Sequence, residues 1–263
     1  MRKYTVEKPN HHQIACVEEI PCDPHGICIA VHGFTSSKES PTVRMLLEKL
    51  PAAGIGVVGI DLPSHGEETS YEEELRLSAC LDSLALVEKD VVERYPDTDI
   101  YYFGSSFGAY VTALYISTRP HKGRKAFFRS AAVNMPSLFL KDSLTEEDEQ
   151  LMKELKEKGY FMQGFSLGRP VRITQGFMDD LAGNDLFEKF DPGLFGPHRI
   201  AMAHGSEDPV IDPAKAESFA ARFGIEKTVF EGEGHSLCND PSTPGKVADL
   251  AIALYLDAGS SNN

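Results

Sequence analysis

Near the middle of the chain the sequence reads Gly104-Ser105-Ser106-Phe107-Gly108, which fits the pattern G-x-S-x-G. The apolar and aromatic residues 100–103 before it predict a short buried strand, and residues 109–117 after it predict an amphipathic helix. A strand, a sharp turn and a helix in this order would expose the Ser106 hydroxyl above the edge of a sheet. Glycine at positions 104 and 108 would let the helix pack close to the strand. The pattern therefore predicts a nucleophile elbow with Ser106 as the nucleophile.

An acid and a histidine follow the serine, each after a predicted strand. Asp208 comes shortly after the apolar residues 200–203, and His235 comes after residues 228–230. A serine hydroxyl is a poor nucleophile at neutral pH and needs a base to take its proton. We expect His235 to be that base, and Asp208 to hold its imidazole in the correct tautomer. The predicted catalytic residues are Ser106, Asp208 and His235.

Three other acidic residues compete with Asp208. Glu207 is its direct neighbour, and Asp212 precedes Pro213, where it is expected to cap a helix. Asp61 also ends a predicted strand, but it precedes the serine in the chain. We expect Asp61 to hydrogen-bond loop backbone instead of orienting the catalytic histidine.

Three other histidines compete with His235. His32 and His65 stand in His-Gly pairs, and neither follows the strand that carries the acid. We expect His32 to orient its own loop by hydrogen bonding. His204 ends the strand before Asp208, and a structural role is expected for it.

A further motif, His32-Gly33-Phe34, follows the apolar residues 27–31. Acyl transfer passes through a tetrahedral intermediate with a negatively charged oxygen, which backbone N–H groups can stabilise. In strand-elbow-helix hydrolases these donors come from the loop after an early strand and from the residue after the nucleophile. We therefore predict an oxyanion hole formed by the N–H groups of Phe34 and Phe107.

Five short motifs occur in a fixed order along the chain. They are HGF at 32–34, DLPSHGE at 61–67, GSSFG at 104–108, HGSEDPVI at 204–211 and GEGHS at 232–236. With them the chain resembles the α/β-hydrolase superfamily. It is most similar to the serine esterase and serine-aminopeptidase-like branch, which includes small microbial cinnamoyl and feruloyl esterases. One departure is Ser105, where this branch commonly has histidine, and we expect it to affect the pocket lining and not the mechanism.

The resemblance implies an α/β-hydrolase fold, with a mostly parallel central sheet flanked by helices and a small inserted cap. The alternation of predicted strands and helices agrees with this. Strands are predicted at residues 12–20, 27–31, 55–60 and 127–133, and helices at 42–50 (with Ser40 as its cap) and 75–95. The core is expected to comprise residues 1–135 and 193–263.

Residues 136–192 interrupt the alternation and are predicted to form the cap. A charged helix is expected at 145–158 with a capping box at 143–146, a strand at 171–174 and a second helix at 175–181. A cap of this kind closes a site from water and shapes its pocket. The candidate substrate-binding residues in it are Phe161, Phe165 and Phe177.

Composition limits the partners of the protein. The 263 residues include 26 Lys and Arg against 40 Asp and Glu, a net charge of −14. Such an acidic chain lacks the basic surface that nucleic acids need, and no apolar run approaches the roughly 20 residues of a membrane span. The expected partner is a small-molecule ester, with no nucleic acid and no membrane, while homo-oligomer formation is left open.

The histidines and cysteines predict neither a metal site nor disulfides. His11, His12, Cys22 and His25 fit no standard zinc spacing, so no metal and no cofactor are expected. The five cysteines are an odd number without a C-x-x-C pair, and no apolar stretch follows the basic N-terminal residues. These features favour a cytoplasmic protein without a signal peptide.

The leading hypothesis is a serine hydrolase, most simply a carboxylesterase, that works through an acyl-enzyme. An aminopeptidase or amidase, a thioesterase and a carbon–carbon bond hydrolase would use the same three residues, and the sequence does not separate them. Dehalogenase and epoxide hydrolase chemistry is disfavoured, because those relatives carry aspartate at the elbow. The alternative outside enzymes is a binding protein on an inactive hydrolase scaffold.

Overall fold

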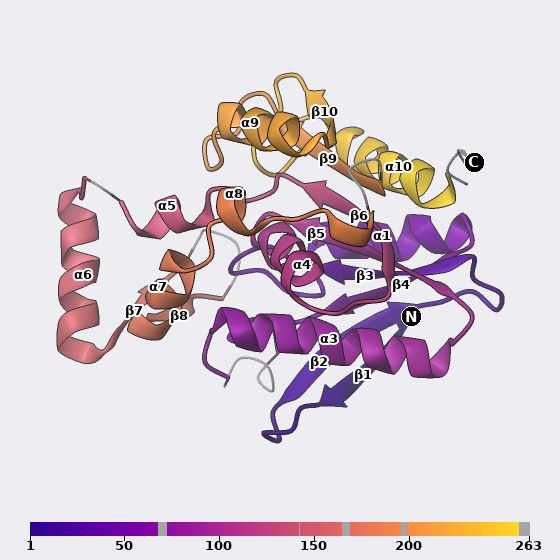
Figure 1. Ribbon diagram of the computed structural model, residues 1–263, viewed down its shortest axis with the longest axis horizontal. Coiled ribbons are helices and arrows are strands. Elements are labelled where there is room, and N and C mark those ends of the chain that lie inside the picture. Colours follow the sequence, from indigo (N-terminus) through magenta and orange to yellow (C-terminus); the bar gives the residue numbers. More distant parts are fainter. Residues whose placement is uncertain (68–72, 142, 165–168, 196–198, 258–263) are drawn as a thin grey trace.

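The computed structural model describes residues 1–67, 73–141, 143–164, 169–195 and 199–257 (Figure 1). The strands are β1 (Arg2–Glu7), β2 (Gln13–Glu19), β3 (Gly26–Val31), β4 (Ile55–Ile60), β5 (Asp99–Ser105), β6 (Gly123–Arg129), β7 (Tyr160–Gln163), β8 (Val171–Thr174), β9 (Ile200–Gly205) and β10 (Glu226–Phe230). The helices are α1 (Pro41–Ala52), α3 (Leu77–Arg94), α4 (Phe107–Thr118), α5 (Met135–Phe139), α6 (Glu146–Lys158), α7 (Gln175–Ala182), α8 (Leu186–Lys189), α9 (Pro213–Phe223), α10 (Thr243–Leu256) and the short 3-10 helix η1 (Gly193–Phe195).

One sheet of eight strands forms the centre of the molecule, in the order β1-β2-β4-β3-β5-β6-β9-β10. The pairs from β4 to β10 are parallel, whereas β1 pairs with β2 and β2 with β4 in the antiparallel sense. The predicted mostly parallel sheet is therefore confirmed. Parallel strands bring their carboxyl ends to the same edge, so the loops that follow β3, β5, β6, β9 and β10 all start there.

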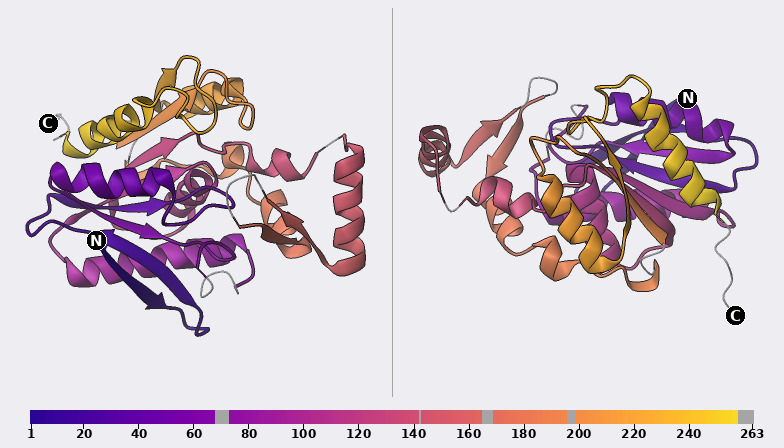
Figure 2. Two further views of the ribbon diagram at one scale, coloured as in Figure 1. Left: turned by 180° about the vertical axis from the view of Figure 1, so that it is seen from behind. Right: turned by 90° about the horizontal axis from the view of Figure 1, so that it is seen from above.

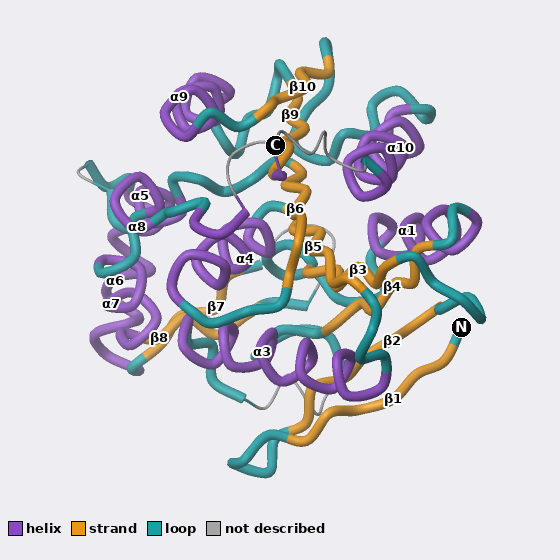
Figure 3. The backbone as a smooth tube through the Cα atoms, turned by 45° about the vertical axis from the view of Figure 1, so that its right-hand side comes forward, coloured by secondary structure: helices purple, strands orange, loops and turns teal. Residues whose placement is uncertain are grey.

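Helices cover both faces of this sheet (Figure 3). Helices α1 and α10 pack on one face, and α3 and α4 pack on the other. Along β3, Cys28 and Ala30 join the core under α1 and α10, while Ile27, Ile29 and Val31 join the core under α3 and α4. Successive side chains of a strand point to opposite faces, so a strand covered on both sides must be apolar at every position. This explains the continuous apolar runs of the sequence.

The helix ends follow local sequence rules, with one correction. Ser40 accepts a hydrogen bond from the N–H of Val43 (3.2 Å) at the start of α1, as predicted. The capping box of α6, however, is not at residues 143–146. It is formed by Thr145 and Asp148, which exchange side-chain and backbone hydrogen bonds, because Asp at the third helical position can reach back as Glu does.

In the described part of the chain, no helix is both long and apolar enough to cross a membrane.

A second correction concerns the strand predicted at residues 127–133. In the structure β6 is Gly123–Arg129, and the chain turns at Ser130, whose φ is 45°. Ala131 and Ala132 lie beyond the end of the strand but are still buried. The N–H of Ala132 bonds to the carbonyl oxygen of Ser106 (3.2 Å) instead of a neighbouring strand. An apolar run shows burial but cannot by itself distinguish a strand from a buried turn.

Between β6 and β9 the chain forms helices α5 to α8 and a separate antiparallel pair, β7 and β8. Helix α6 and this pair project from one end of the molecule (Figure 2). Helix α7 docks on α3 through Asp180, which accepts hydrogen bonds from Arg76 Nε (2.8 Å) and from the N–H of Leu77 (2.9 Å). The first N–H groups of a helix lack partners within it and attract negative charge. Asp180 thus caps α3 from a distant segment.

Candidate active site

Ser106 stands between β5 and α4 in a backbone conformation that residues other than glycine seldom adopt. Its φ is 53° and its ψ is −114°, a strain that costs about 1–3 kcal/mol. Hydrogen bonds hold it on both sides, because its N–H donates to the Arg129 carbonyl (2.9 Å) and its own carbonyl accepts from Ala109 (3.0 Å) and Ala132 (3.2 Å). The surrounding structure therefore keeps the Ser106 side chain at the turn between strand and helix.

The two glycines of the motif are required by close packing. A Cβ atom at Gly104 would lie 2.4 Å from Cα of Ala109, and one at Gly108 would lie 2.2 Å from the carbonyl oxygen of Val31. Both obstacles are backbone atoms that cannot move aside. The packing of α4 against the sheet thus depends on these positions having no side chain, as the sequence predicted.

Ser106, His235 and Asp208 form a continuous chain of hydrogen bonds. Oγ of Ser106 lies 2.8 Å from Nε2 of His235, and Nδ1 of His235 lies 2.7 Å from Oδ2 of Asp208. The three side chains come from the turn after β5 and from the loops after β9 and β10. In this arrangement the imidazole can take a proton from Oγ while the carboxylate holds the opposite ring nitrogen protonated.

The carboxylate of Asp208 is buried and well supplied with donors. Its Oδ1 accepts from the N–H groups of Val210 (2.8 Å) and Ile211 (2.9 Å), and Oδ2 faces His235. Burial raises the pKa of Asp208, but the hydrogen bond from His235 and the two backbone donors outweigh it, so the pKa lies below its ordinary value. The group is therefore ionised at neutral pH and can stabilise an imidazolium.

The competing acids lie elsewhere. Asp212 caps α9, with Oδ1 accepting from the N–H of Ala214 (2.8 Å), as predicted. Glu207 is exposed. Asp61 accepts from the backbone N–H groups of Lys38 (2.7 Å) and Glu67 (3.0 Å), which is the loop role expected of it.

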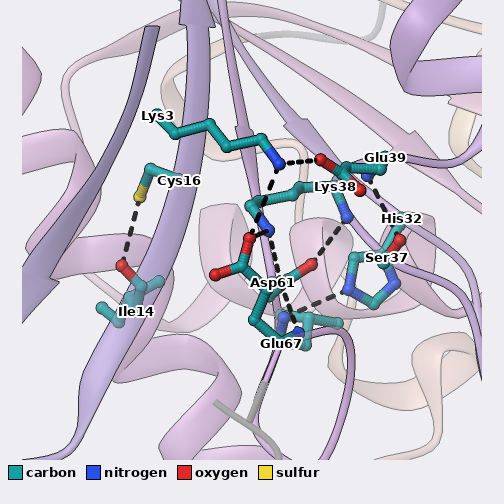
Figure 4. A network of polar contacts seen from close by, with 10 residues as sticks. Lys3, Ile14, Cys16, His32, Ser37, Lys38, Glu39, Asp61 and Glu67 are labelled. Atoms are coloured by element: carbon teal, nitrogen blue, oxygen red, sulfur yellow. Dashed lines mark hydrogen bonds and ion pairs between the residues drawn. The ribbon is translucent and has the colours of Figure 1, made fainter. Parts of the chain in front are cut away.

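Asp61 also forms a buried ion pair that the sequence analysis missed. Nζ of Lys38 lies 3.0 Å from Oδ2 of Asp61 and 2.6 Å from Oε1 of Glu67 (Figure 4). The Lys38 side chain is only 1% exposed. Burial lowers the pKa of Lys38, but its two acidic partners raise it by more, so it is charged. The pair fastens the loop after β3 to the loop after β4.

His32 fixes the loop that carries Phe34. Its Nε2 accepts from the N–H of Leu62 (3.1 Å), so Nδ1 carries the proton and donates to the carbonyl oxygen of Gly33 (2.7 Å). That carbonyl and the N–H of Phe34 belong to one planar trans peptide unit, so holding one fixes the direction of the other. Burial lowers the pKa of His32 to about 4, which keeps the ring neutral.

The predicted oxyanion residues lie beside the serine. A Cβ atom at Gly33 would lie 3.3 Å from Cβ and 3.9 Å from Oγ of Ser106. The rings of Phe34 and Phe107 meet edge to face, 5.5 Å apart. The His65 ring packs against both, at 5.5 Å and 6.2 Å. The loop after β3 and the start of α4 are thus in contact around Ser106.

The candidate residues of the segment between β6 and β9 have different locations. Phe177 is fully buried, with its ring centre 6.1 Å from that of Phe107 and 6.4 Å from that of Phe34. Phe161 is buried in the small sheet, where it pairs with Ile173. Phe165 lies outside the described residues. The structure therefore brings Phe177, and not Phe161, against the predicted oxyanion residues.

The expectation for Ser105 is wrong. Its side chain is buried, and its Oγ accepts a hydrogen bond from Nη1 of Arg129 (2.9 Å), so it does not line an open pocket. Sequence reasoning also overlooked Arg129. The available signal was a charged residue at the end of the apolar run 126–128, where an unpartnered charge would be costly.

Across the residues that the structure describes, no group of three or more His, Cys, Asp or Glu is placed to hold a metal ion.

Solved structures similar to this one extend over nearly the whole chain. A putative hydrolase from Agrobacterium vitis S4 has a TM-score of 0.78 at 19% identity, covering 97% of this chain and 98% of that one. Est1E from Butyrivibrio proteoclasticus, bound to ferulic acid, has a TM-score of 0.72 at 16% identity, with coverage of 95% and 98%. A thermostable carboxyl esterase from Bacillus coagulans has a TM-score of 0.66 at 16% identity, covering 96% of each chain. At such identities the likeness shows the fold alone.

Among curated protein sequences there is no significant match. The sequence model of the family described as serine aminopeptidase, S33, matches residues 22–168, which is more than half of the chain. The match includes the elbow at 104–108 and ends before Asp208 and His235. From this match and the shared fold, the chain belongs to the serine aminopeptidase S33 family of α/β-hydrolases.

Proposed function

We propose that the protein hydrolyses carboxylic esters through a covalent acyl-enzyme on Ser106, with His235 as general base and acid and Asp208 as the orienting carboxylate. The observation that carries the proposal is the unbroken hydrogen-bonded chain, 2.8 Å from Ser106 to His235 and 2.7 Å from His235 to Asp208. A protein that only binds ligands needs none of these contacts, nor a strained serine at a strand-helix turn.

In the first half-reaction Oγ of Ser106 attacks the acyl carbon while its proton passes to Nε2 of His235. The electron pair of the carbonyl moves onto its oxygen, and the N–H groups of Phe34 and Phe107 are the proposed donors to that oxyanion. Each such donor contributes about 3–4 kcal/mol of transition-state stabilisation. The bond to the alcohol then breaks, and the alcohol leaves with the proton from His235.

In the second half-reaction water attacks the acyl-enzyme. His235 takes the proton of the water and returns it to Oγ as the carboxylic acid leaves, so the enzyme regains its starting state. Asp208 stays ionised throughout and stabilises the imidazolium in both halves.

The acyl group is proposed to be apolar or aromatic. The partly exposed rings of Phe34 and Phe139 pack beside Ser106 on the buried rings of Phe107 and Phe177, with centres 5.5–6.4 Å apart. Aromatic surfaces of this kind favour flat, apolar groups. The bound ferulic acid of Est1E, a protein of the same fold, agrees with this choice.

A second candidate is an aminopeptidase or amidase, because the matching family is described as serine aminopeptidase. Such an enzyme must hold the substrate amine with a carboxylate. The first turn of α6 offers exposed Glu146, Glu147 and Glu149 for that purpose. Thioester hydrolysis would use the same catalytic residues.

The test is a substrate panel at fixed enzyme concentration. It comprises p-nitrophenyl esters of increasing chain length, methyl ferulate, an acyl thioester and aminoacyl-anilides. The proposal predicts that esters have the highest kcat/KM. If the anilides are the best substrates, and neutralising the three glutamates of α6 raises their KM, the aminopeptidase assignment replaces it.

An organophosphonate probe tests the class of protein independently of the substrate. It should label wild type on Ser106 and fail to label Ser106→Ala. Absence of labelling in correctly folded wild type would favour a binding protein on an inactive scaffold and contradict the proposal.

A further inference from the structure

Arg129, at the carboxyl end of β6, contacts both halves of the candidate site. Its backbone carbonyl accepts the hydrogen bond from the N–H of Ser106 (2.9 Å). Its Nη1 donates to Oγ of Ser105 (2.9 Å), the residue before the nucleophile. Its Nη2 donates to the carbonyl oxygen of Ser236, the residue after the histidine. One residue therefore joins the elbow and the histidine loop.

The guanidinium of Arg129 is an unusual group to find in this place. The residue is only 8% exposed, and burying a cation is costly unless it is paired and hydrogen-bonded. Burial lowers the pKa of Arg129 to about 10, although Cys238, Asp208 and Glu233 nearby favour the charged form. The side chain therefore remains protonated at neutral pH and keeps its donors.

The loop after β10, which carries His235, makes most of its other hydrogen bonds within itself or with the neighbouring loop after β9. Glu233 accepts from the N–H groups of Asn239 (2.8 Å) and Asp240 (2.9 Å), and its carbonyl accepts from the N–H of Glu207 (2.9 Å). These bonds shape the loop and tie it to the acid. The contact from Arg129 instead reaches it from the strand beside the nucleophile.

We propose that Arg129 is a positioning residue that sets the separation of His235 Nε2 and Ser106 Oγ by holding the Ser236 carbonyl at a fixed distance from the elbow. The inference rests on the proposed function. The planar guanidinium suits the task because its N–H groups point in fixed directions and can engage two acceptors at once. Ser105 takes part in the same positioning, because its hydroxyl is one of the two acceptors of the Arg129 side chain.

The test compares Arg129→Met and Arg129→Lys with wild type on one ester substrate. The methionine variant keeps an unbranched apolar stem but loses both donors, so the loop can shift. Displacements of about 1 Å cost roughly 100-fold in rate, so we expect kcat to fall roughly 10- to 100-fold while KM changes less than about threefold. Lysine can reach one acceptor and should recover part of the loss.

Arg124→Met is the matched control. Arg124 lies on the same strand, is exposed, and is paired with Asp99 at the opposite end of β6. Its kcat should stay within about twofold of wild type, as is usual for an exposed surface change. Thermal unfolding of every variant shows whether it is folded. If Arg129→Met does not fold, Ser105→Ala takes its place, because it removes one acceptor at the cost of a single hydroxyl and should lower kcat by a smaller factor.

The rate of labelling by an organophosphonate separates this inference from the proposed function. If wild type reacts and Arg129→Met reacts as fast, the positioning role is wrong although Ser106 is an active nucleophile. If kcat falls equally in the lysine and methionine variants and their thermal midpoints are also lower, Arg129 contributes to stability alone. If wild type itself neither reacts nor hydrolyses esters, the proposed function fails, and the positioning inference fails with it.

Discussion

Nε2 of His204 lies 3.2 Å from Oδ2 of Asp208, the same oxygen that faces Nδ1 of His235 at 2.7 Å. This nitrogen also lies 3.1 Å from the carbonyl oxygen of Ile211. A carbonyl oxygen can only accept, so Nε2 of His204 carries a proton and donates. Burial lowers the pKa of His204 and favours the neutral ring. His204 thus donates to the Ile211 carbonyl as an uncharged ring and lies against the Asp208 carboxylate, a contact beyond the general structural role expected from the sequence.

Replacing His204 by Phe should destabilise the protein while leaving much of the activity. The change removes the donor to the Ile211 carbonyl beside the buried Asp208, and an unsatisfied buried acceptor costs about 1–3 kcal/mol. Val210, Ile211 and His235 still bind the carboxylate, so kcat should fall less than about tenfold. Urea unfolding and steady-state kinetics measure both effects. His204→Gln, which keeps a donor, is the control, and equal stability of the two variants would contradict this role.

Substitutions of Ser106 should separate activity from backbone strain. Both Ser106→Ala and Ser106→Gly should lose hydrolysis by several orders of magnitude, as expected for removal of a catalytic nucleophile. Glycine adopts the observed φ of 53° without steric cost, so the glycine variant should be more stable than the alanine variant by about 1 kcal/mol. Denaturant unfolding gives this difference. If Ser106→Ala keeps an activity within tenfold of wild type, Ser106 is not the nucleophile.

Asparagine substitutions at Asp208 and Asp212 should have unequal effects. Asp208→Asn places an amide against His235 and favours the wrong tautomer, which in a Ser-His-Asp triad lowers kcat by about 10,000-fold. Asp212→Asn keeps the helix cap, because asparagine caps as well as aspartate, so its kcat should stay within about twofold of wild type. Thermal midpoints are measured alongside. A collapse of activity in the second variant alone would mean that the wrong acid was chosen.

Buried neutral histidines should make the protein sensitive to acid. Burial and the neighbouring His32 lower the pKa of His65 from 6.5 to about 3. Between these values the unfolded chain binds a proton that the folded chain does not. The stability due to this group is therefore present above pH 6.5 and is lost as the pH falls. For wild type, we expect the free energy of unfolding to fall by about 2 kcal/mol between pH 7 and pH 5 because of His65 alone.

His65→Phe tests this contribution. The loss of its hydrogen bond to the Pro63 carbonyl (2.8 Å) affects both pH values equally. The difference in unfolding free energy between pH 7 and pH 5 should therefore shrink by about 2 kcal/mol relative to wild type. An unaltered difference in His65→Phe would show that His65 does not resist protonation in the folded state.

Phe177→Leu should alter substrate preference more than Phe161→Leu. Phe177 packs against Phe34 and Phe107, whereas Phe161 lies in the small sheet of β7 and β8. Both changes keep an apolar side chain and avoid the cavity that alanine would leave. We expect the ratio of kcat/KM for methyl ferulate and p-nitrophenyl acetate to change by about tenfold for Phe177→Leu. Equal changes in the two variants would assign the effect to general loosening of the segment between β6 and β9.

The sequence alone determined the fold and named the side chains that meet at the candidate site. Continuous apolar runs such as residues 27–31 indicated strands covered on both faces, because burial on both sides requires apolar residues at every position. Gly104 and Gly108 could be assigned to close packing, and Ser40 and Asp212 to helix caps, because these roles depend on local geometry. The elbow motif, the chain order and the resemblance to α/β-hydrolases selected Ser106, Asp208 and His235, which the structure links by hydrogen bonds.

Tertiary structure decided the features that depend on contacts between distant segments. Lys38 and Asp61 form a buried ion pair, Asp180 caps α3 from α7, and Arg129 reaches both Ser105 and Ser236. No periodicity or motif encodes such contacts, because each depends on how strands are ordered in the sheet and how loops meet at its edge. The same reason explains why Phe177, rather than Phe161, packs beside Phe107. A local pattern shows that an aromatic side chain is buried, but only the assembled fold decides which neighbours it has.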